Sequence, residues 1–600
     1  MGRPLPDIVM LCSREQTASD YHARKIAETL GAEVEVVSLS GEGEMFEQFL
    51  PQCRAVIVHA NTLSLLACTP DKAARWREAL ANVAAQVFIY GFDPTERHRA
   101  ILRIFSSDSI LGVEELPARA DCAFHVTGNH RRRLRQLSGV TIRRIDPAPQ
   151  RCFIVSTHPA CEILIRAGDK PFFLSIKSCG SEMFFVAGDD IADLDEELPR
   201  HASLLLRFGS LAPILIFLRA ALGDRVWSND RARACFIIDD PLLKQRYGFL
   251  DYRQLAATMQ DQKFSAAIAF IPWNYRRSSS STTRMFSSGK LSLSVCIHGC
   301  DHTRAEFAGA DVGALAAKAS TALQRMREHK RCTGVSFDEV IVFPQGLFSP
   351  DAMAALRASG YLAAVNTDLS PATVKHSLTL RDALEVALTR FEDFPLFGRR
   401  YPNDIAEIAF DLFLGKPALL VEHHGYFRNG YGPLNAFIAQ VNALDQGLEW
   451  TNLADICSHA CVTRTDQDGV IEIRFFTDRF STTNTTSSQQ NYVLLRRCTR
   501  PLRAVLVKGK EANYQIADDE LKLAVSLGPG ETADIHVLPR FSQCRSYSWN
   551  PNSLYRSKVL VRRVLSEIRD NYVDTTPVLS SILYHARKLT APSSGSKSGV

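Results

Sequence analysis

Short apolar runs alternate with amphipathic segments through the first 130 residues of the chain. Strand-like runs rich in Val and Ile occupy 7–12, 32–39, 54–60 and 85–91. Between them, the segments 18–30 and 70–84 carry apolar residues at helical spacing. This alternation predicts βαβ units and therefore a parallel sheet that is covered by helices. Further apolar runs predict additional strands and a hairpin, so a first α/β domain should span 1–200.

The same rhythm restarts after residue 230 and continues to about 460. Seven strand-like runs alternate with helical segments there: 233–240, 265–273, 291–299, 339–346, 361–367, 385–391 and 417–425. Six or seven strands joined by helical crossovers predict an incomplete or distorted (β/α) barrel over 231–460. Because the carboxyl ends of barrel strands share one rim, functional side chains should gather there.

An apolar helix is predicted between these two domains, at 204–222, within a helical linker that spans 201–230. Arg207, Gly209 and Pro213 interrupt it, whereas a membrane-spanning helix needs about 20 nearly uncharged residues. We therefore expect a buried helix and no transmembrane segment.

The pattern changes beyond 465, where alternating apolar and polar positions replace the βα rhythm. Five short runs separated by Gly, Asn and Pro predict a small antiparallel β-sandwich at 465–540. A helix and a disordered, Ser/Gly-rich tail are expected over 550–600. In outline, the first domain resembles a flavodoxin-like or amidotransferase-like layer. The predicted fold class is thus α/β, with a distorted (β/α) barrel between a flavodoxin-like domain and a β-sandwich.

Composition narrows the classes of function. The 70 Lys and Arg against 65 Asp and Glu leave a net charge of +5 over 600 residues, which is too dilute for nucleic-acid binding without a clustered patch. The basic stretches 131–136 and 561–570 are each interpreted as solvated helix faces. The 15 cysteines include no CxxC pair, and the first residues lack a secretory signal, so a cytoplasmic location is expected. The oligomeric state stays undefined.

Metal-binding side chains stand at the predicted carboxyl ends of two strands. Asp239 and Asp240 close the first barrel strand, and His298 and His302 follow the third at a spacing that places both imidazoles on one face of a helical turn. Two imidazoles and one carboxylate form a three-ligand set that leaves positions open for water and substrate. One aspartate would bind the cation and the other would stay free as a base. A cation would also relieve the repulsion between the two adjacent carboxylates.

These residues, in this order, resemble the polysaccharide deacetylase superfamily over about 230–450. The first motif of that family matches "FIIDD", the second matches "HGCDH", and a final strand that ends in His matches "LLVEHH". The resemblance implies a deacetylase-type (β/α) barrel with Asp239 as general base and His423 as general acid. It implies Asp240, His298 and His302 as ligands of a divalent metal ion, with zinc expected first and cobalt, nickel or manganese as alternatives.

The third family motif, Arg-x-Pro-x-Gly, is only partly present. Pro344 and Gly346 are kept in "VFPQG", but Val342 stands where the family has the arginine that orients the base. Arg390 is a candidate replacement from elsewhere in the chain. Trp273 is expected at the lip of the site, where its ring would stack on a sugar, and we expect it to bind substrate together with Pro344 and Gly346.

Two further residues near the motifs have alternative interpretations. His424 competes with His423 for the acid role, and alternation along a strand lets only one of them point inward; His423 is favoured. Glu306 follows His302 by one turn and is expected as a solvated helix charge, with support of a metal ligand as the alternative.

The leading hypothesis is a metal-dependent hydrolase that removes an acyl group, with the N-acetyl group of an amino sugar or glycan as the expected substrate. The alternative is a catalytically silent, deacetylase-like protein that acts as a carbohydrate-binding or scaffold module, because the motif arginine is missing. The partner is thus a glycan in either case, and no nucleic acid is expected.

Overall fold

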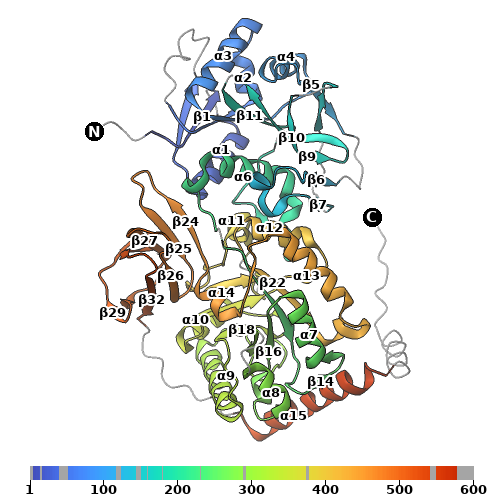
Figure 1. Ribbon diagram of the computed structural model, residues 1–600. Helices are drawn as coiled ribbons and strands as arrows, with labels where there is room; N and C mark the ends of the chain where they lie inside the picture. The colour runs from blue at the N-terminus through green and yellow to red at the C-terminus, as the bar shows by residue number, and fades with distance from the viewer. Residues whose placement is uncertain are drawn as a thin grey trace, which may run out of the picture.

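The chain has three structured units, followed by one long helix. The structure is a computed structural model that describes residues 5–13, 16–39, 52–116, 123–143, 151–157, 160–178, 180–188, 190–229, 231–287, 292–372, 377–540, 549 and 551–576. Figure 1 shows the N-terminal unit at the top, a barrel-like unit below it, a pair of sheets at the side, and helix α15 (Ser553–Ile568) beneath the barrel. The expected disordered tail lies outside the described residues.

The N-terminal unit is built on a nine-stranded mixed sheet in the order β2-β1-β3-β4-β11-β10-β9-β6-β7. The pairs from β2 to β11 are parallel, whereas the pairs from β11 to β7 are antiparallel. The parallel sheet predicted from the βα rhythm is therefore half of a mixed sheet. The strands are β1 (Ile8–Ser13), β2 (Val34–Leu39), β3 (Ala55–His59), β4 (Gln86–Tyr90), β6 (Phe124–Val126), β7 (Thr141–Ile142), β9 (Glu162–Ala167), β10 (Lys170–Ser178) and β11 (Ser181–Val186).

Helices lie between β1 and β2 and between β3 and β4, and a separate pair of strands, β5 (Ile110–Glu115) and β8 (Arg151–Val155), lies beside the sheet. The helices of this unit are α1 (Ala18–Thr29), α2 (Ala60–Leu66), α3 (Pro70–Val83), α4 (Glu96–Phe105) and α5 (Arg131–Leu134).

Helix α6 (Phe208–Leu222) is the apolar helix expected after the first domain. It packs on the N-terminal sheet, where the rings of Phe217 and Phe88 lie 5.0 Å apart. By length and composition the stretch Leu204–Arg225 could cross a membrane, but 61% of its most apolar window is buried within the protein. Burial of this kind is what a core helix shows.

The central unit is a curled sheet of parallel strands in the order β21-β19-β18-β17-β16-β13-β22, with β23 paired to β13. An isolated parallel bridge between Arg400 and Leu420 links the two edges, so the sheet curls toward closure as a distorted barrel. The strands are β13 (Arg233–Asp239), β16 (Ala266–Phe270), β17 (Leu293–His298), β18 (Val340–Val342), β19 (Ala363–Asn366), β21 (Leu396–Gly398), β22 (Ala418–His423) and β23 (Glu449–Trp450).

Alternation along these strands divides their side chains between two apolar clusters. On β13, Phe236 and Ile238 join the cluster that includes the surrounding helices, whereas Cys235 and Ile237 join the one inside the barrel. The helices around the barrel are α7 (Tyr252–Gln262), α8 (Ser280–Ser287), α9 (Val312–Thr333), α10 (Pro350–Ser359), α11 (Leu380–Leu384), α12 (Ile405–Phe413), α13 (Gly432–Leu444) and α14 (Leu453–Ser458).

Two sheets follow the barrel, in the orders β24-β25-β27-β31-β30 and β26-β32-β28-β29, and they share one apolar cluster. The pair β25–β27 is parallel and the other pairs are antiparallel, so the purely antiparallel pattern expected here is not found. The strands are β24 (Cys461–Thr465), β25 (Ile471–Phe475), β26 (Arg479–Thr483), β27 (Gln490–Arg497), β28 (Leu502–Val507), β29 (Lys510–Glu511), β30 (Gln515–Ala517), β31 (Glu520–Leu527) and β32 (Thr532–Pro539).

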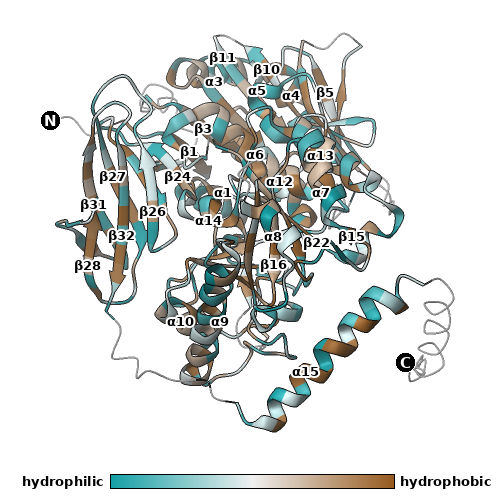
Figure 2. Cartoon of the chain, turned by 60° about the horizontal axis from the view of Figure 1, so that its bottom comes forward, coloured by the Kyte–Doolittle hydropathy of each residue, from teal (hydrophilic) through white to brown (hydrophobic). Residues whose placement is uncertain are grey.

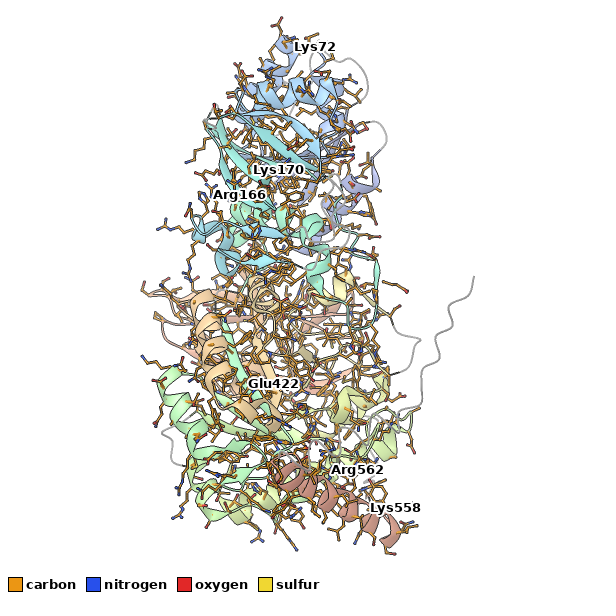
Figure 3. The ribbon with its side chains drawn as sticks, turned by 90° about the vertical axis from the view of Figure 1, so that its right-hand side faces the viewer. Lys72, Arg166, Lys170, Glu422, Lys558 and Arg562 are labelled. Atoms are coloured by element: carbon orange, nitrogen blue, oxygen red, sulfur yellow. The ribbon has the colours of Figure 1, made fainter. Side chains whose placement is uncertain are left out.

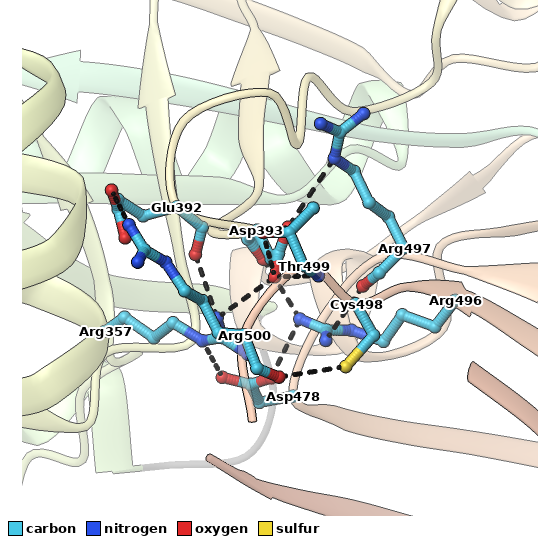
Figure 4. Close-up of polar contacts among 9 residues, drawn as sticks. All are labelled: Arg357, Glu392, Asp393, Asp478, Arg496, Arg497, Cys498, Thr499 and Arg500. Atoms are coloured by element: carbon cyan, nitrogen blue, oxygen red, sulfur yellow. Dashed lines mark hydrogen bonds and ion pairs between the residues drawn. The ribbon is translucent and has the colours of Figure 1, made fainter. Parts of the chain in front are cut away.

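A buried polar cluster joins these sheets to the barrel (Figure 4). Asp478 accepts hydrogen bonds of 2.9 and 3.1 Å from Arg357 and lies 2.8 Å from Arg496. Arg496 also donates to the backbone carbonyl of Asp393, whose carboxylate accepts from Thr499. Because each buried charge has an opposite partner, the cluster can sit at an interface between two apolar units.

Candidate active site and metal centre

The carboxyl ends of the barrel strands meet at one site. Asp239 ends β13, His298 ends β17, His423 ends β22 and Arg399 follows β21. By strand alternation, Asp239 continues the inward series of which Ile237 is a member. The barrel strands therefore end with polar side chains at one rim, as predicted.

The three predicted metal-ligating residues converge. Oδ1 of Asp240 lies 3.2 Å from Nε2 of His298 and 2.9 Å from Nε2 of His302. Despite this closeness, that buried oxygen accepts no well-directed hydrogen bond from any residue that the structure describes, and the three ligand atoms all lie within 4.8 Å of one another. Two imidazole nitrogens and this unpaired carboxylate oxygen fit a divalent cation that takes one ligand from each residue.

The HxxxH segment is a loop, which corrects the helical turn expected from its spacing. His298 ends a strand, and both Gly299 and His302 have left-handed backbones, with φ of 63° and 57°. The buried carboxylate of Glu306 accepts hydrogen bonds of 3.1, 2.8 and 3.1 Å from the backbone N–H groups of Cys300, Asp301 and His302. Glu306 therefore shapes the loop that carries a ligand, and the expectation of a solvated helix charge is wrong.

Each histidine has a different partner for its second ring nitrogen. Nδ1 of His298 lies 3.1 Å from the backbone carbonyl of Val342, an acceptor that keeps the proton on Nδ1 and leaves Nε2 free to bind a cation. Nδ1 of His302 lies 3.2 Å from Nη2 of Arg563. A guanidinium offers only N–H donors, so Nδ1 of His302 is the acceptor in this contact.

The arginine that orients Asp239 is Arg399. Its Nη1 and Nη2 donate to the two carboxylate oxygens of Asp239 at 2.9 and 2.8 Å, and both side chains are buried. Arg390, the replacement proposed from the sequence, instead bonds to Asp382 and to a backbone carbonyl near the surface, so that proposal is wrong. The bridge that brings the two edges of the sheet together also brings Arg399 to β13.

Both aspartates have pKa values below those of ordinary carboxylates. Burial would raise the pKa of Asp239, but Arg399 and His298 outweigh burial and hold this pKa below its usual range. For Asp240, burial is likewise outweighed by His302 and His298, and its pKa lies well below the usual range. Both carboxylates are therefore ionised at neutral pH, as a base and a metal ligand require.

His423 and His424 have different surroundings: His423 ends β22 and is exposed, whereas His424 begins the short helical turn that follows and is buried. His423 faces Asp239 across the β13–β22 pair and lies near enough to lower the pKa of that carboxylate. His424 is buried against the rings of Tyr247 and Phe249, whose centroids lie 5.5 and 6.4 Å away. His423 is therefore the histidine placed beside Asp239.

The expected substrate-binding residues lie around the same loops. The backbone N–H of Trp273 donates to Cys300 in the metal-site loop, and the guanidinium of Arg325 covers its ring at 5.1 Å. Pro344 and Gly346 form a turn after β18, where Gly346 has a φ of 67°. Their contact with substrate stays a prediction.

Helix α15 covers one side of the site, although Arg563 follows His302 by 261 residues. The hydroxyl of Tyr555 donates to Asp301 at 2.9 Å, and Glu567 forms an ion pair of 2.6 Å with Lys244 after β13. The inner side of this helix is therefore buried, so the solvated face expected over 561–570 is found on its outer side alone.

Neither a known family model nor a curated protein sequence matches the chain. Among solved structures, the chain is similar to Agd3, described as a novel carbohydrate deacetylase, with 9% identity and a TM-score of 0.46 over 89% of this chain and 100% of that chain. It is also similar to a family 4 carbohydrate esterase from Streptomyces lividans in complex with acetate, with 12% identity and a TM-score of 0.23 over 36% of this chain and 91% of that one.

A third similar structure is a mutant of BA3943, a CE4 family pseudoenzyme with restored enzymatic activity. It has 11% identity and a TM-score of 0.25, over 38% of this chain and 68% of that chain. Carbohydrate deacetylases are thus among the solved structures that the chain resembles, as its motifs predicted. The roles of the residues rest on the geometry of the site itself.

Sequence reasoning missed two contributors to this site, Arg399 and Arg563, and it gave support of a metal ligand by Glu306 only as the alternative. Arg399 stands outside any motif-like spacing, and Arg563 belongs to a segment that reads as an ordinary basic amphipathic helix. A signal was present only for Glu306, since a lone acidic residue a few positions beyond a polar turn can satisfy its backbone N–H groups.

Proposed function

We propose that this protein is a divalent-metal-dependent hydrolase that removes an acyl group, the N-acetyl group of an amino sugar or glycan, in the cytoplasm. One observation carries the proposal: the two adjacent carboxylates have separate partners. Asp240 meets two imidazole nitrogens within 3.2 Å, while Asp239 is held by Arg399. A ligand and a base are therefore provided side by side.

Asp240, His298 and His302 would hold the cation, with zinc as the first candidate and cobalt, nickel or manganese as alternatives. When bound, a divalent cation acidifies water near neutral pH and polarises an acyl carbonyl. Asp239 accepts the proton of the water that attacks the carbonyl carbon. Arg399 keeps this carboxylate ionised and fixes its orientation through two parallel hydrogen bonds, one to each oxygen.

His423 donates a proton to the amine as the C–N bond breaks, so the products are a free amine and a carboxylate. Its position supports this role, because it lies opposite Asp239 in the β13–β22 register. Trp273, Pro344 and Gly346 are proposed to line the part of the site that receives the sugar.

The alternative is a catalytically silent carbohydrate-binding or scaffold protein. It was suggested by the missing motif arginine at Val342, and the bidentate contact from Arg399 removes that reason. The enzyme is therefore the favoured hypothesis.

The test is release of acetate from N-acetylated chito-oligosaccharides by the zinc-loaded protein. We expect turnover in the wild type and its loss, with glycan binding kept, in Asp239→Asn. Asp534→Asn, an exposed aspartate on β32, is the matched control and should leave turnover unchanged. Binding of the glycan without acetate release in the wild type would favour the silent binding module instead.

A further inference from the structure

Helix α15 carries an unusual concentration of exposed apolar side chains. Seven of the fourteen exposed large hydrophobic residues in the described part of the chain lie between 554 and 572. They are Leu554, Leu560, Val561, Val564, Leu565, Ile568 and Tyr572, each 41% exposed or more. Six of the seven lie on α15 itself, and an exposed apolar set of this size indicates a binding surface, whereas single exposed residues do not.

The helix cannot turn this row inward, because its opposite side is already bound to the barrel. Val559, Arg563 and Asp570 are buried, and Asp570 accepts a hydrogen bond of 2.7 Å from Tyr247. Leu554, Val561, Leu565 and Ile568 form the main apolar row. At 3.6 residues per turn, this row falls within an arc of about 60° on the side away from the buried residues. Figure 2 shows hydrophobic and hydrophilic residues alternating along the ribbon of α15 at the edge of the molecule.

Basic side chains flank the apolar row. Lys558, Arg562 and Arg569 follow one another along the next strip of the helix, and Figure 3 shows the first two at the end of the molecule opposite Lys72. The three acidic residues of 553–576 are all engaged in ion pairs: Glu567 with Lys244, and both Asp570 and Asp574 with Arg569.

We propose that the outer face of α15, defined by Leu554, Val561, Leu565 and Ile568 with the flanking Lys558 and Arg562, binds the surface of an anionic lipid bilayer. A helix with an apolar row and a basic strip lies in the plane of the interface, with its apolar side among the acyl chains and its cations among anionic headgroups. The face lies at the edge of the molecule, where a bilayer can approach it.

Charge argues against a second copy of the chain as the occupant. In a twofold contact between two α15 helices, the basic strips would lie near each other with no acidic strip to oppose them. An anionic bilayer supplies the missing negative charge along the whole helix. This inference is independent of the proposed hydrolase activity.

Flotation of the full-length protein with lipid vesicles tests the proposal. We expect binding to phosphatidylcholine vesicles that contain about 30% phosphatidylglycerol, weak binding to pure phosphatidylcholine, and weakening by salt. Leu565→Glu/Ile568→Glu and Lys558→Glu/Arg562→Glu should each weaken binding by at least about tenfold. The matched controls are Ile516→Glu, which is exposed on β30, and Lys72→Glu on α3; both should bind like the wild type.

Melting temperatures of all variants, measured in parallel, separate loss of binding from loss of folding. Equal binding to neutral and anionic vesicles, or no binding by the wild type, would overturn the proposal. So would a dimer in solution that Leu565→Glu/Ile568→Glu converts to a monomer, since the face would then belong to a second copy. Vesicle binding that appears only after removal of 577–600 would assign the face to that segment and would also overturn it.

Discussion

Arg399 grips both carboxylate oxygens of Asp239, at 2.9 and 2.8 Å, from the opposite edge of the barrel sheet. The contact spans 160 residues and is buried on both sides. It provides the charge partner that the third motif lacks, and it leaves the neighbouring Asp240 to the two histidines. The separate roles proposed for the two adjacent carboxylates, base and metal ligand, therefore depend on one long-range ion pair.

Replacement of Arg399 by Lys should impair both turnover and stability. The ammonium of lysine cannot form the two parallel hydrogen bonds by which the guanidinium orients the Asp239 carboxylate, so we expect a fall in turnover on the order of 100-fold. Loss of one charge-assisted hydrogen bond should lower the free energy of unfolding by about 2 kcal/mol. Acetate release and urea unfolding measure the two effects. Arg390→Lys is the control, and equal losses in both variants would contradict the role of Arg399.

Removal of either imidazole ligand should abolish high-affinity metal binding. We expect His298→Ala and His302→Ala each to weaken zinc binding by at least about 100-fold, because a three-ligand set loses one donor. Titration calorimetry on the purified protein measures this, together with metal content after dialysis. His201→Ala, whose side chain is 69% exposed, should retain wild-type affinity. Unchanged zinc content in the two ligand variants would exclude the site.

Arg563 should oppose metal binding at His302. Its N–H group points at Nδ1 of the ring, whereas an imidazole that binds a cation through Nε2 carries its proton on Nδ1. In Arg563→Gln, a neutral amide can offer a carbonyl acceptor to that proton, and one positive charge is removed. We expect zinc affinity to rise about tenfold in calorimetry. Arg562→Gln is the control; weaker zinc binding by Arg563→Gln would show that the guanidinium supports the site.

Loss of Asp478 should loosen the C-terminal sheets from the barrel. Asp478→Ala leaves Arg357 and Arg496 buried without their shared partner, which should cost about 3–5 kcal/mol. Urea unfolding should then show an early transition for the C-terminal sheets, with faster proteolysis between the two units. Asp534→Ala on β32 removes an exposed carboxylate and should change neither measurement. A loss below 1 kcal/mol in Asp478→Ala would show that the cluster is not needed.

Buried His329 should make the fold sensitive to acid. Burial lowers the pKa of His329 to about 4, its Nε2 lies 2.9 Å from the hydroxyl of Ser278, and its Nδ1 has no partner within the described part of the chain. The unfolded chain takes up the proton near pH 6.5 and the folded chain only near 4, so stability is complete above pH 6.5 and falls as pH drops toward 4. The loss should reach up to about 3 kcal/mol.

His329→Gln keeps a partner for Ser278 but cannot titrate. The difference in unfolding free energy between pH 7 and pH 4 should therefore be smaller in this variant than in the wild type. His125→Gln, which changes an exposed histidine, should behave like the wild type. An identical pH dependence in all three proteins would contradict this account.

Much of the barrel and of its site could be predicted from the sequence. Apolar runs that end in Asp239, His298 and His423 place these residues at the carboxyl ends of strands, and the ends of parallel strands share one rim. Alternation also predicts that only one of His423 and His424 points toward the inside of the barrel, but it does not say which. Less could be predicted for the N-terminal sheet, because a local pattern does not reveal which edge continues with antiparallel strands.

The sequence by itself determined which side chains stand at the rim, because strand periodicity and strand ends are local properties of the chain. The tertiary structure alone decided that the guanidinium of Arg399 contacts Asp239 and that the guanidinium of Arg563 contacts His302, over separations of 160 and 261 residues. It also decided that the HxxxH segment is a loop, since the carboxylate of Glu306 satisfies backbone groups that a helix would have paired internally. Such contacts leave no periodic trace, because their geometry exists only once the sheet has curled and α15 has docked.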